Sequence, residues 1–312
     1  FIISVKTDNN GTSADNEFTL PWIGTYDVDW GDGNTDTGVV HAQTHTYSTA
    51  GTYDVKVTAT TGRIYFNNSK DKDKLIQIKN WGTCAWTSMA SAFYSCRSLS
   101  NISAVDIINL TNCTSLQAMF RNSSVSQINT SNWDVSNITS LYQTFTFCSN
   151  IQSLDVSNWD VSNVNAMESL FRGMTALTTL DVSSWDTSNV SNALSAAKFI
   201  FQDSPNVNPD ISNWVLGSNN LDKMLEDSDS FDRSLANWDI SSTPNLINFM
   251  QNASGMSTAN YDATLISWVS QNPTSTNANF GGSQYTLGGA AEAARNTLIN
   301  TYGWTITDGG GV

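Results

Sequence analysis

Residues 157–167 read SNWDVSNVNAM, and near copies of this phrase stand at 131–141 (SNWDVSNITSL) and 183–193 (SSWDTSNVSNA). Their tryptophans are 26 residues apart, and weaker copies follow at steps of 29, 24 and 30 residues. Upstream, Ile108 and then a further tryptophan occupy the same position at steps of 25 and 27. The spacing predicts seven stacked repeat units and a closing unit. The side chains expected to anchor their core are Trp81, Trp133, Trp159, Trp185, Trp214, Trp238 and Trp268.

Each unit also carries a second apolar phrase, which reads MESLFRGM at residues 167–174. Its apolar residues are spaced i, i+3, i+4 and i+7, the spacing of one face of a helix. They are Met167, Leu170, Phe171 and Met174. LDVSNWDV at 154–161 alternates instead, which is typical of a strand. A unit of one short strand and one short helix cannot bury its apolar face alone, so the pattern predicts α/β units whose stacking builds the core.

The phrases DVSNWDVSNVxxM and F-x-x-C/M-x-x-L resemble the BspA-like leucine-rich repeats of bacterial surface proteins and mycoplasma lipoproteins, over about residues 81–268. Residues 269–312 are similar to the closing segment of such arrays and end in a glycine-rich run. The resemblance implies an α/β leucine-rich-repeat solenoid, surface exposure, and adhesion or partner binding without a shared catalytic motif. The irregular steps around Val215 depart from the family pattern, so we expect distortion there.

Residues 1–66 carry a different pattern, in which β-branched and aromatic residues alternate with polar ones in FIISVKT, EFTLPW, TYDVDW and GTYDVKVTAT. This predicts an antiparallel sandwich of short strands. VDWGDG at 28–33, HTY at 45–47 and GTY at 51–53 resemble the polycystic-kidney-disease (PKD) domain, an Ig-like β-sandwich. The resemblance implies that the turn residues have structural roles, namely Trp30, Gly31, Asp32 and Gly33.

The predicted fold is therefore multidomain, an all-β Ig-like sandwich followed by an α/β leucine-rich-repeat solenoid. Residues 67–80, with the lysine-rich run at 70–79, are expected to form a solvated connection or N-terminal cap between the two.

Composition excludes several classes of protein. Asn, Ser and Thr make up 111 of the 312 residues, charged residues only 13%, and the net charge is -14. The 11 Trp, 9 Tyr and 13 Phe exclude a disordered chain, and the negative charge argues against a nucleic-acid partner. No stretch is long and apolar enough to insert into a membrane. FIISVKT lacks the features of a signal peptide. Because the chain opens within a predicted strand at Phe1 and stops in the glycine-rich run DGGGV, we expect it to be part of a longer polypeptide, whose missing ends could hold a signal, anchor or assembly domain.

Aligned aspartates are the candidates for metal binding. Calcium accepts carboxylate oxygens, so Asp134, Asp160 and Asp186 at one repeat position are possible calcium ligands. The alternative is that each aspartate begins a turn and accepts hydrogen bonds from free backbone N–H groups. We favour the turn interpretation, and we expect no other metal and no cofactor.

No catalytic residue is expected. His41 and His45 are the only histidines, so the repeats hold no imidazole for nucleophilic catalysis. Asp29, Asp32 and Asp36 could form a cluster with His45, but the PKD resemblance implies turn and packing roles for them. The repeated tryptophans are assigned to the core, because a sugar platform need not recur in every repeat.

The sequence thus predicts a non-enzymatic extracellular binding or adhesion protein, displayed on a bacterial cell surface or a bacteriophage virion. Its expected partner is a glycan or protein on the host or a neighbouring cell, recognised by the exposed strand face. One alternative is a structural subunit of a surface filament or virion that acts by self-association. The other is a carbohydrate-active enzyme with a pair of carboxylates.

Overall fold

The computed structural model describes residues 1–190, 197–217, 220–242 and 244–312. The repeat phrase at 183–193 therefore ends outside the described residues, as do parts of the phrases around Trp214 and Trp238. The chain forms two compact units, Phe1–Leu154 and Asp155–Val312.

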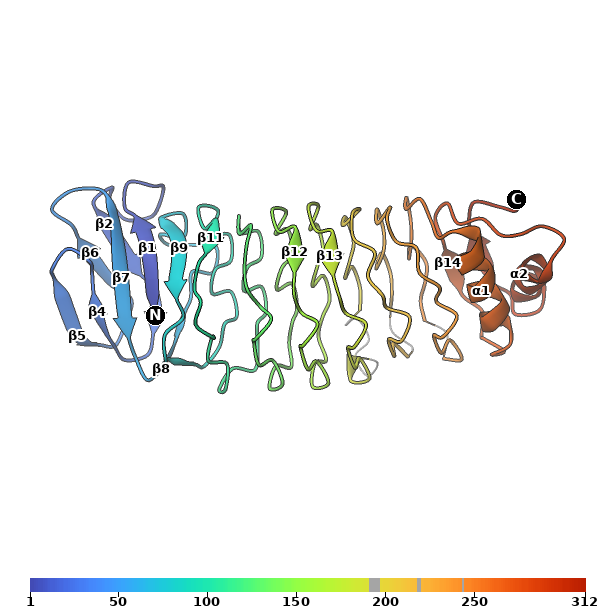
Figure 1. The fold of residues 1–312 in the computed structure, drawn as a ribbon, viewed down its shortest axis with the longest axis horizontal. Helices are drawn as coiled ribbons and strands as arrows, with labels where there is room; N and C mark the ends of the chain where they lie inside the picture. Colours follow the sequence, from blue (N-terminus) through green and yellow to red (C-terminus); the bar gives the residue numbers. More distant parts are fainter. Residues whose placement is uncertain (191–196, 218–219, 243) are drawn as a thin grey trace. The chain divides into compact units, whose positions relative to one another are not determined.

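Short strands and turns make up most of both units (Figure 1). The first unit contains β1 (Ile2–Lys6), β2 (Glu17–Leu20), β3 (Trp22–Ile23), β4 (Tyr26–Asp29), β5 (Thr35–Val39), β6 (Gln43–Thr46), β7 (Thr52–Thr58), β8 (Thr61–Ile64), β9 (Leu75–Asn80), β10 (Ala85–Trp86), β11 (Asn101–Ile102) and β12 (Ser153–Leu154). The second contains β13 (Thr179–Leu180), α1 (Thr258–Val269), β14 (Asn277–Asn279), α2 (Ala290–Asn300) and β15 (Thr305–Thr307).

A six-stranded sheet organises the first unit, in the order β11-β9-β1-β7-β4-β5. β1 lies between β7 and β9 and is antiparallel to both (Figure 1). The alternation in IISVK buries Ile3 and Val5 on one face, and Ile3 pairs with the equally buried Val55 of β7. The smaller sheets β10-β8-β3 and β2-β6 complete this part of the chain. The strands predicted for residues 1–66 are confirmed, whereas the Ig-like topology stays a prediction.

The lysine-rich segment at 67–80 is not solvated throughout, contrary to the expectation. Leu75 and Ile78 of β9 are fully buried because β9 supplies β1 with its second strand neighbour. Asp71 and Lys74 have no exposed surface either, and both side chains bind the backbone of residues 12–19. The charged run therefore includes two residues that tie the N-terminal loop to the sheet.

The second phrase of each repeat forms successive turns in place of the predicted helix. In the unit of Trp159, Ser169 and Gly173 have φ of 58° and 70°, outside the right-handed helical region. Every second backbone N–H group in these turns donates a hydrogen bond to a carbonyl oxygen of the next repeat. The bonds run from Ser169 to Lys198, from Phe171 to Ile200 and from Gly173 to Gln202. The apolar residues still point inward, since Met167, Leu170, Phe171 and Met174 are all fully buried.

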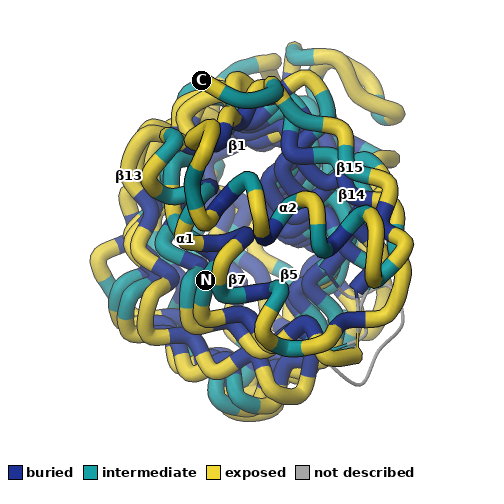
Figure 2. The backbone as a smooth tube through the Cα atoms, turned by 90° about the vertical axis from the view of Figure 1, so that its right-hand side faces the viewer, coloured by how far each residue is buried: buried dark blue, intermediate teal, exposed yellow. Residues whose placement is uncertain are grey.

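The same turns recur in the first unit. Residues with positive φ stand four positions apart in successive repeats, as Ser91 and Ser95, Ala118 and Asn122, and Gln143 and Phe147. Backbone hydrogen bonds join these repeats, because the Phe93 N–H donates to the Met119 oxygen (2.8 Å) and the Phe120 N–H to the Thr144 oxygen (3.0 Å). Buried residues lie on the inside of the turns and exposed residues on their outer corners (Figure 2).

The predicted α/β leucine-rich-repeat solenoid is therefore wrong. Among the described residues the structure has only two helices, and both lie after residue 257. The i, i+3, i+4, i+7 spacing led to the error, because two successive turns place the same residues on one side as a helix does. The positive φ angles distinguish the two, and hydrophobic periodicity does not report them.

A pair of alanines tests the turn geometry. Ala118 is buried and has a positive φ of 51°. Ala92, in the preceding repeat, is also buried but does not have a positive φ. We expect Ala118→Gly to change the free energy of unfolding by less than about 0.5 kcal/mol, since relief of the left-handed conformation offsets the lost methyl group and the lost chain entropy. Ala92→Gly should lower it by about 1–2 kcal/mol. Urea unfolding measures both, and equal losses would contradict the turn assignment.

Candidate functional site

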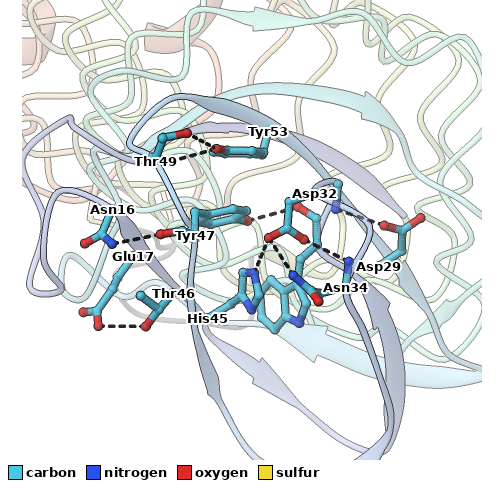
Figure 3. Close-up of polar contacts among 12 residues, drawn as sticks. Asn16, Glu17, Asp29, Asp32, Asn34, His45, Thr46, Tyr47, Thr49 and Tyr53 are labelled. Atoms are coloured by element: carbon cyan, nitrogen blue, oxygen red, sulfur yellow. Dashed lines mark hydrogen bonds and ion pairs between the residues drawn. The ribbon is translucent and has the colours of Figure 1, made fainter.

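The VDWGDG turn is packed against the strand that carries His45. The Asp32 carboxylate accepts hydrogen bonds from the N–H and side-chain amide of Asn34, both at 3.0 Å, and lies 2.8 Å from Nε2 of His45 (Figure 3). Burial opposes ionisation of Asp32, but the bonds from His45 and Asn34 outweigh it and lower its pKa. The Trp30 ring stacks on the imidazole with 4.9 Å between centroids. These side chains bind one another, which is a packing arrangement and not an open catalytic cluster.

The two glycines of this turn have different surroundings. Gly31 (φ +85°) lies against the backbone of Asp54 in β7, whereas Gly33 (φ +95°) has open space where a side chain would be. The N–H of Gly31 donates to the Asp29 carboxylate at 2.9 Å. The VDWGDG turn therefore requires a glycine at position 31, where its backbone lies against the backbone of β7.

The three aspartates considered as calcium ligands cap turns. In each, Oδ1 accepts a hydrogen bond from the N–H two residues later: Ser136 at 3.1 Å, Ser162 at 3.0 Å and Ser188 at 2.9 Å. The serine bonds lower the pKa of Asp134 and Asp186. Within the described part of the chain, no three His, Cys, Asp or Glu side chains are grouped so that they could hold a metal. The geometry is that of the turn interpretation.

Asp134 allows the two interpretations to be separated. Asp134→Asn keeps the Oδ1 acceptor, so we expect almost unchanged stability, whereas Asp134→Ala removes the turn cap and should cost about 1 kcal/mol. Calcium at about 5 mM should leave the melting temperatures of the parent chain and of both variants unchanged. A site with one carboxylate lacks the six to eight oxygen ligands that calcium takes. Differential scanning calorimetry with and without chelator measures this. A calcium-dependent rise that Asp134→Asn abolishes would restore the metal site.

The repeated tryptophans lie inside both units. Trp81 and Trp133 of the first unit contact edge to face at 6.0 Å. In the second unit, the Trp159, Trp185 and Trp214 rings stack almost parallel, 6.3 and 6.0 Å apart. The indole N–H groups of Trp185 and Trp214 donate to the carbonyl oxygens of Val156 and Val182 in the preceding repeat, and those of Trp238 and Trp268 make equivalent bonds. All seven anchors are buried, as expected for core side chains.

Pairs of cations and aromatic rings occupy the outer side of the turns, a feature that sequence reasoning missed. In the first unit the Arg121 guanidinium lies 5.1 Å from the centre of the Tyr94 ring and donates to Oε1 of Gln143 at 2.7 Å. All three side chains are half-buried. The dipeptide Phe-Arg, which recurs at one repeat position as residues 120–121 and 171–172, was the signal that could have revealed it. In the second unit Arg172 and Lys198 both approach the Phe199 ring.

A polar hollow of about 330 Å³ opens on the second unit. Three successive repeats contribute to it, and every lining side chain is polar: Asp210, Ser212, Asp232, Arg233, Ser234, Asn237 and Asn260. The sequence does not reveal it, because its members are up to 50 residues apart and occupy different repeat positions.

Units of about 26 residues, joined by backbone hydrogen bonds around a buried indole row, define a repeat protein with a polar and mostly uncharged surface. Described residues include no helix long and apolar enough to cross a membrane. The chain belongs to the family described as Mycoplasma protein of unknown function, DUF285, which matches residues 40–153, 114–220, 139–264 and 194–287. This family is related to the BspA-like repeats. No curated protein matches the chain.

Proposed function

We propose that this chain is a non-enzymatic, extracellular binding or adhesion protein of a bacterial surface or a bacteriophage virion, whose partner is a surface glycan or protein. The repeat units form the recognition surface, and residues 1–66 serve as a PKD-like spacer. The family relationship to surface proteins supports this assignment, as does the large share of Asn, Ser and Thr.

The observation that carries the proposal is the group formed by Tyr94, Arg121 and Gln143. Arginine and tyrosine are the side chains that dominate recognition surfaces, because they combine a large contact area with directed hydrogen bonds. Here the guanidinium is held between a ring and an amide, so little side-chain entropy is lost when a partner binds.

Binding of the full chain to glycan arrays, protein arrays and bacterial cells tests the proposal. We expect Arg121→Ala to weaken binding at least about tenfold, which corresponds to about 1.4 kcal/mol. Arg97→Ala makes the same charge change at an exposed position of the same unit and should have less than about a twofold effect. Absence of any ligand in all three assays would overturn the proposal, and turnover of a polysaccharide would then favour an enzyme.

A second candidate function, self-association in a filament or virion, is favoured by one apolar loop. Val105 is 94% exposed and Ile107 58% exposed, and the loop is held in place because the Asp106 carboxylate accepts hydrogen bonds from the N–H groups of Trp81 and Gly82. Light scattering after size exclusion decides between the two. Oligomers that Val105→Asp disperses would support assembly, and a monomer at all concentrations would rule it out.

A further inference from the structure

The polar hollow on the second unit is suited to a ligand that hydrogen-bonds on all sides. Its lining residues are all polar, so hydrogen bonds rather than burial of apolar side chains would drive binding there. The hollow, of about 330 Å³, lies among side chains of three successive repeats. We propose that this hollow is a subsite for a single neutral sugar ring, bound through adjacent hydroxyl groups. This inference rests on the proposed binding function.

The two carboxylates of the hollow are fixed in advance. Oδ1 of Asp232 accepts hydrogen bonds from the N–H and hydroxyl of Ser257, both at 2.8 Å, and from the Asn260 amide at 2.7 Å. Oδ1 of Asp210 accepts from the N–H and hydroxyl of Ser212 at 3.1 and 2.7 Å. Among the described residues these bonds all fall on Oδ1, which leaves each Oδ2 as an acceptor for a ligand hydroxyl.

Both carboxylates stay ionised at neutral pH. The Ser212 bonds, with Arg233 nearby, lower the pKa of Asp210. At Asp232 burial opposes ionisation, but the bonds from Asn260 and Ser257 lower its pKa. Two negative charges face one guanidinium, so an anionic sugar is disfavoured relative to a neutral one.

Donors complement these acceptors. Arg233 is exposed and uses one of its N–H groups on the Asn208 carbonyl at 3.4 Å, which leaves the others for a ligand. The exposed Asn237 adds an amide that can donate and accept. A sugar hydroxyl both donates and accepts, so neighbouring hydroxyls can bridge a carboxylate and a guanidinium at once.

One such subsite binds weakly, because each hydrogen bond replaces one with water. We expect a Kd on the order of 1 mM for a monosaccharide, and tighter binding to a dense surface glycan when many copies of the chain are displayed together.

Nuclear magnetic resonance titration of the full chain with the methyl pyranosides of glucose, galactose and mannose tests the proposal, with methyl glucuronide as the anionic counterpart. At least one neutral glycoside should shift the side-chain amides of Asn237 and Asn260 in a saturable way, and the glucuronide should bind more weakly. Asp210→Asn keeps the Oδ1 acceptor for Ser212 but replaces Oδ2, and Arg233→Gln removes the guanidinium. Each should lower affinity about tenfold or more.

Asp155→Asn is the matched control, since Asp155 caps the equivalent turn of an earlier repeat by accepting hydrogen bonds from Ser157 and does not line the hollow. It should bind as the parent chain does, and unchanged melting temperatures would show that all variants fold. If glycosides or arrayed glycans bind but neither hollow variant weakens them, the subsite is wrong and the binding function stands. If cells or proteins bind and no neutral glycoside does, the subsite is equally wrong. If the chain binds nothing in any assay, both proposals fail.

Discussion

Replacing Lys74 with methionine should lower the free energy of unfolding by about 3–5 kcal/mol, as expected when one member of a buried charged cluster is removed. The Lys74 ammonium has no exposed surface and donates to the carbonyl oxygens of Ser13 (3.2 Å), Ala14 (2.7 Å) and Glu17 (2.9 Å), and to the Ser13 hydroxyl (2.9 Å). Methionine has a similar shape but cannot donate. It would leave these oxygens and the nearby Asp71 carboxylate buried without their cation.

Urea unfolding of the full chain, followed by tryptophan fluorescence, measures the loss. Lys79→Met is the control, because Lys79 pairs with Asp54 at 2.8 Å on the surface of the same segment and such pairs contribute at most about 1 kcal/mol. Equal losses for the two variants would show that the buried cluster does not stabilise the first unit.

Asp71 makes the stability contributed by the buried cluster of Asp71 and Lys74 depend on pH. Burial opposes its ionisation, yet the bonds from Ser13 and Thr19 prevail and lower its pKa below the ordinary value of 3.8. A carboxyl whose pKa is lower in the folded than in the unfolded chain stabilises the fold above the unfolded pKa. That contribution is lost as pH falls through the folded pKa. Stability of the parent chain should therefore drop below about pH 4, with a smaller pH-dependent drop for Asp71→Asn.

The repeat spacing and the burial of its tryptophans could be predicted from the sequence, because a repeat protein places its core side chain at a regular spacing. Trp185 and Trp214 illustrate this, since each indole N–H bonds a carbonyl of the preceding repeat. The local conformation between anchors could not be predicted. MESLFRGM satisfies a helix and a pair of turns equally well, and only the backbone angles at Ser169 and Gly173 separate them.

The buried cluster and the polar hollow were missed for a different reason. Lys74 binds oxygens that lie 57 to 61 residues earlier, and nothing in the run DKDKL indicates which lysine turns inward. The hollow joins Asp210, Arg233 and Asn260, whose repeat positions differ, so aligning the repeats does not bring them together. Both depend on which side of a turn each side chain takes, which hydrophobic periodicity does not encode for polar residues.

Substitution of the two turn glycines should produce very unequal effects, about 3–4 kcal/mol for Gly31→Ala and about 1 kcal/mol for Gly33→Ala. Both residues have positive φ, so both substitutions pay for a conformation that favours glycine. Only at Gly31 would the new methyl carbon lie 2.5 Å from the backbone oxygen of Asp54. That atom belongs to β7, whose neighbour β1 pairs Ser4 with Asp54, so relief of the clash requires movement of the central sheet.

The comparison also separates the two roles considered for the VDWGDG motif. If the turn serves packing, substitution should destabilise the chain strongly at Gly31 and only slightly at Gly33. An added methyl carbon at Gly33 would have no neighbouring atom within 4 Å. A ligand site would give the reverse, with stability kept and binding lost when the open side of the turn is blocked at Gly33. Melting temperatures and array binding of the two variants, measured together, distinguish these patterns. Because Asp32 and His45 already bind each other at 2.8 Å, we expect the packing pattern, with full ligand binding by Gly33→Ala.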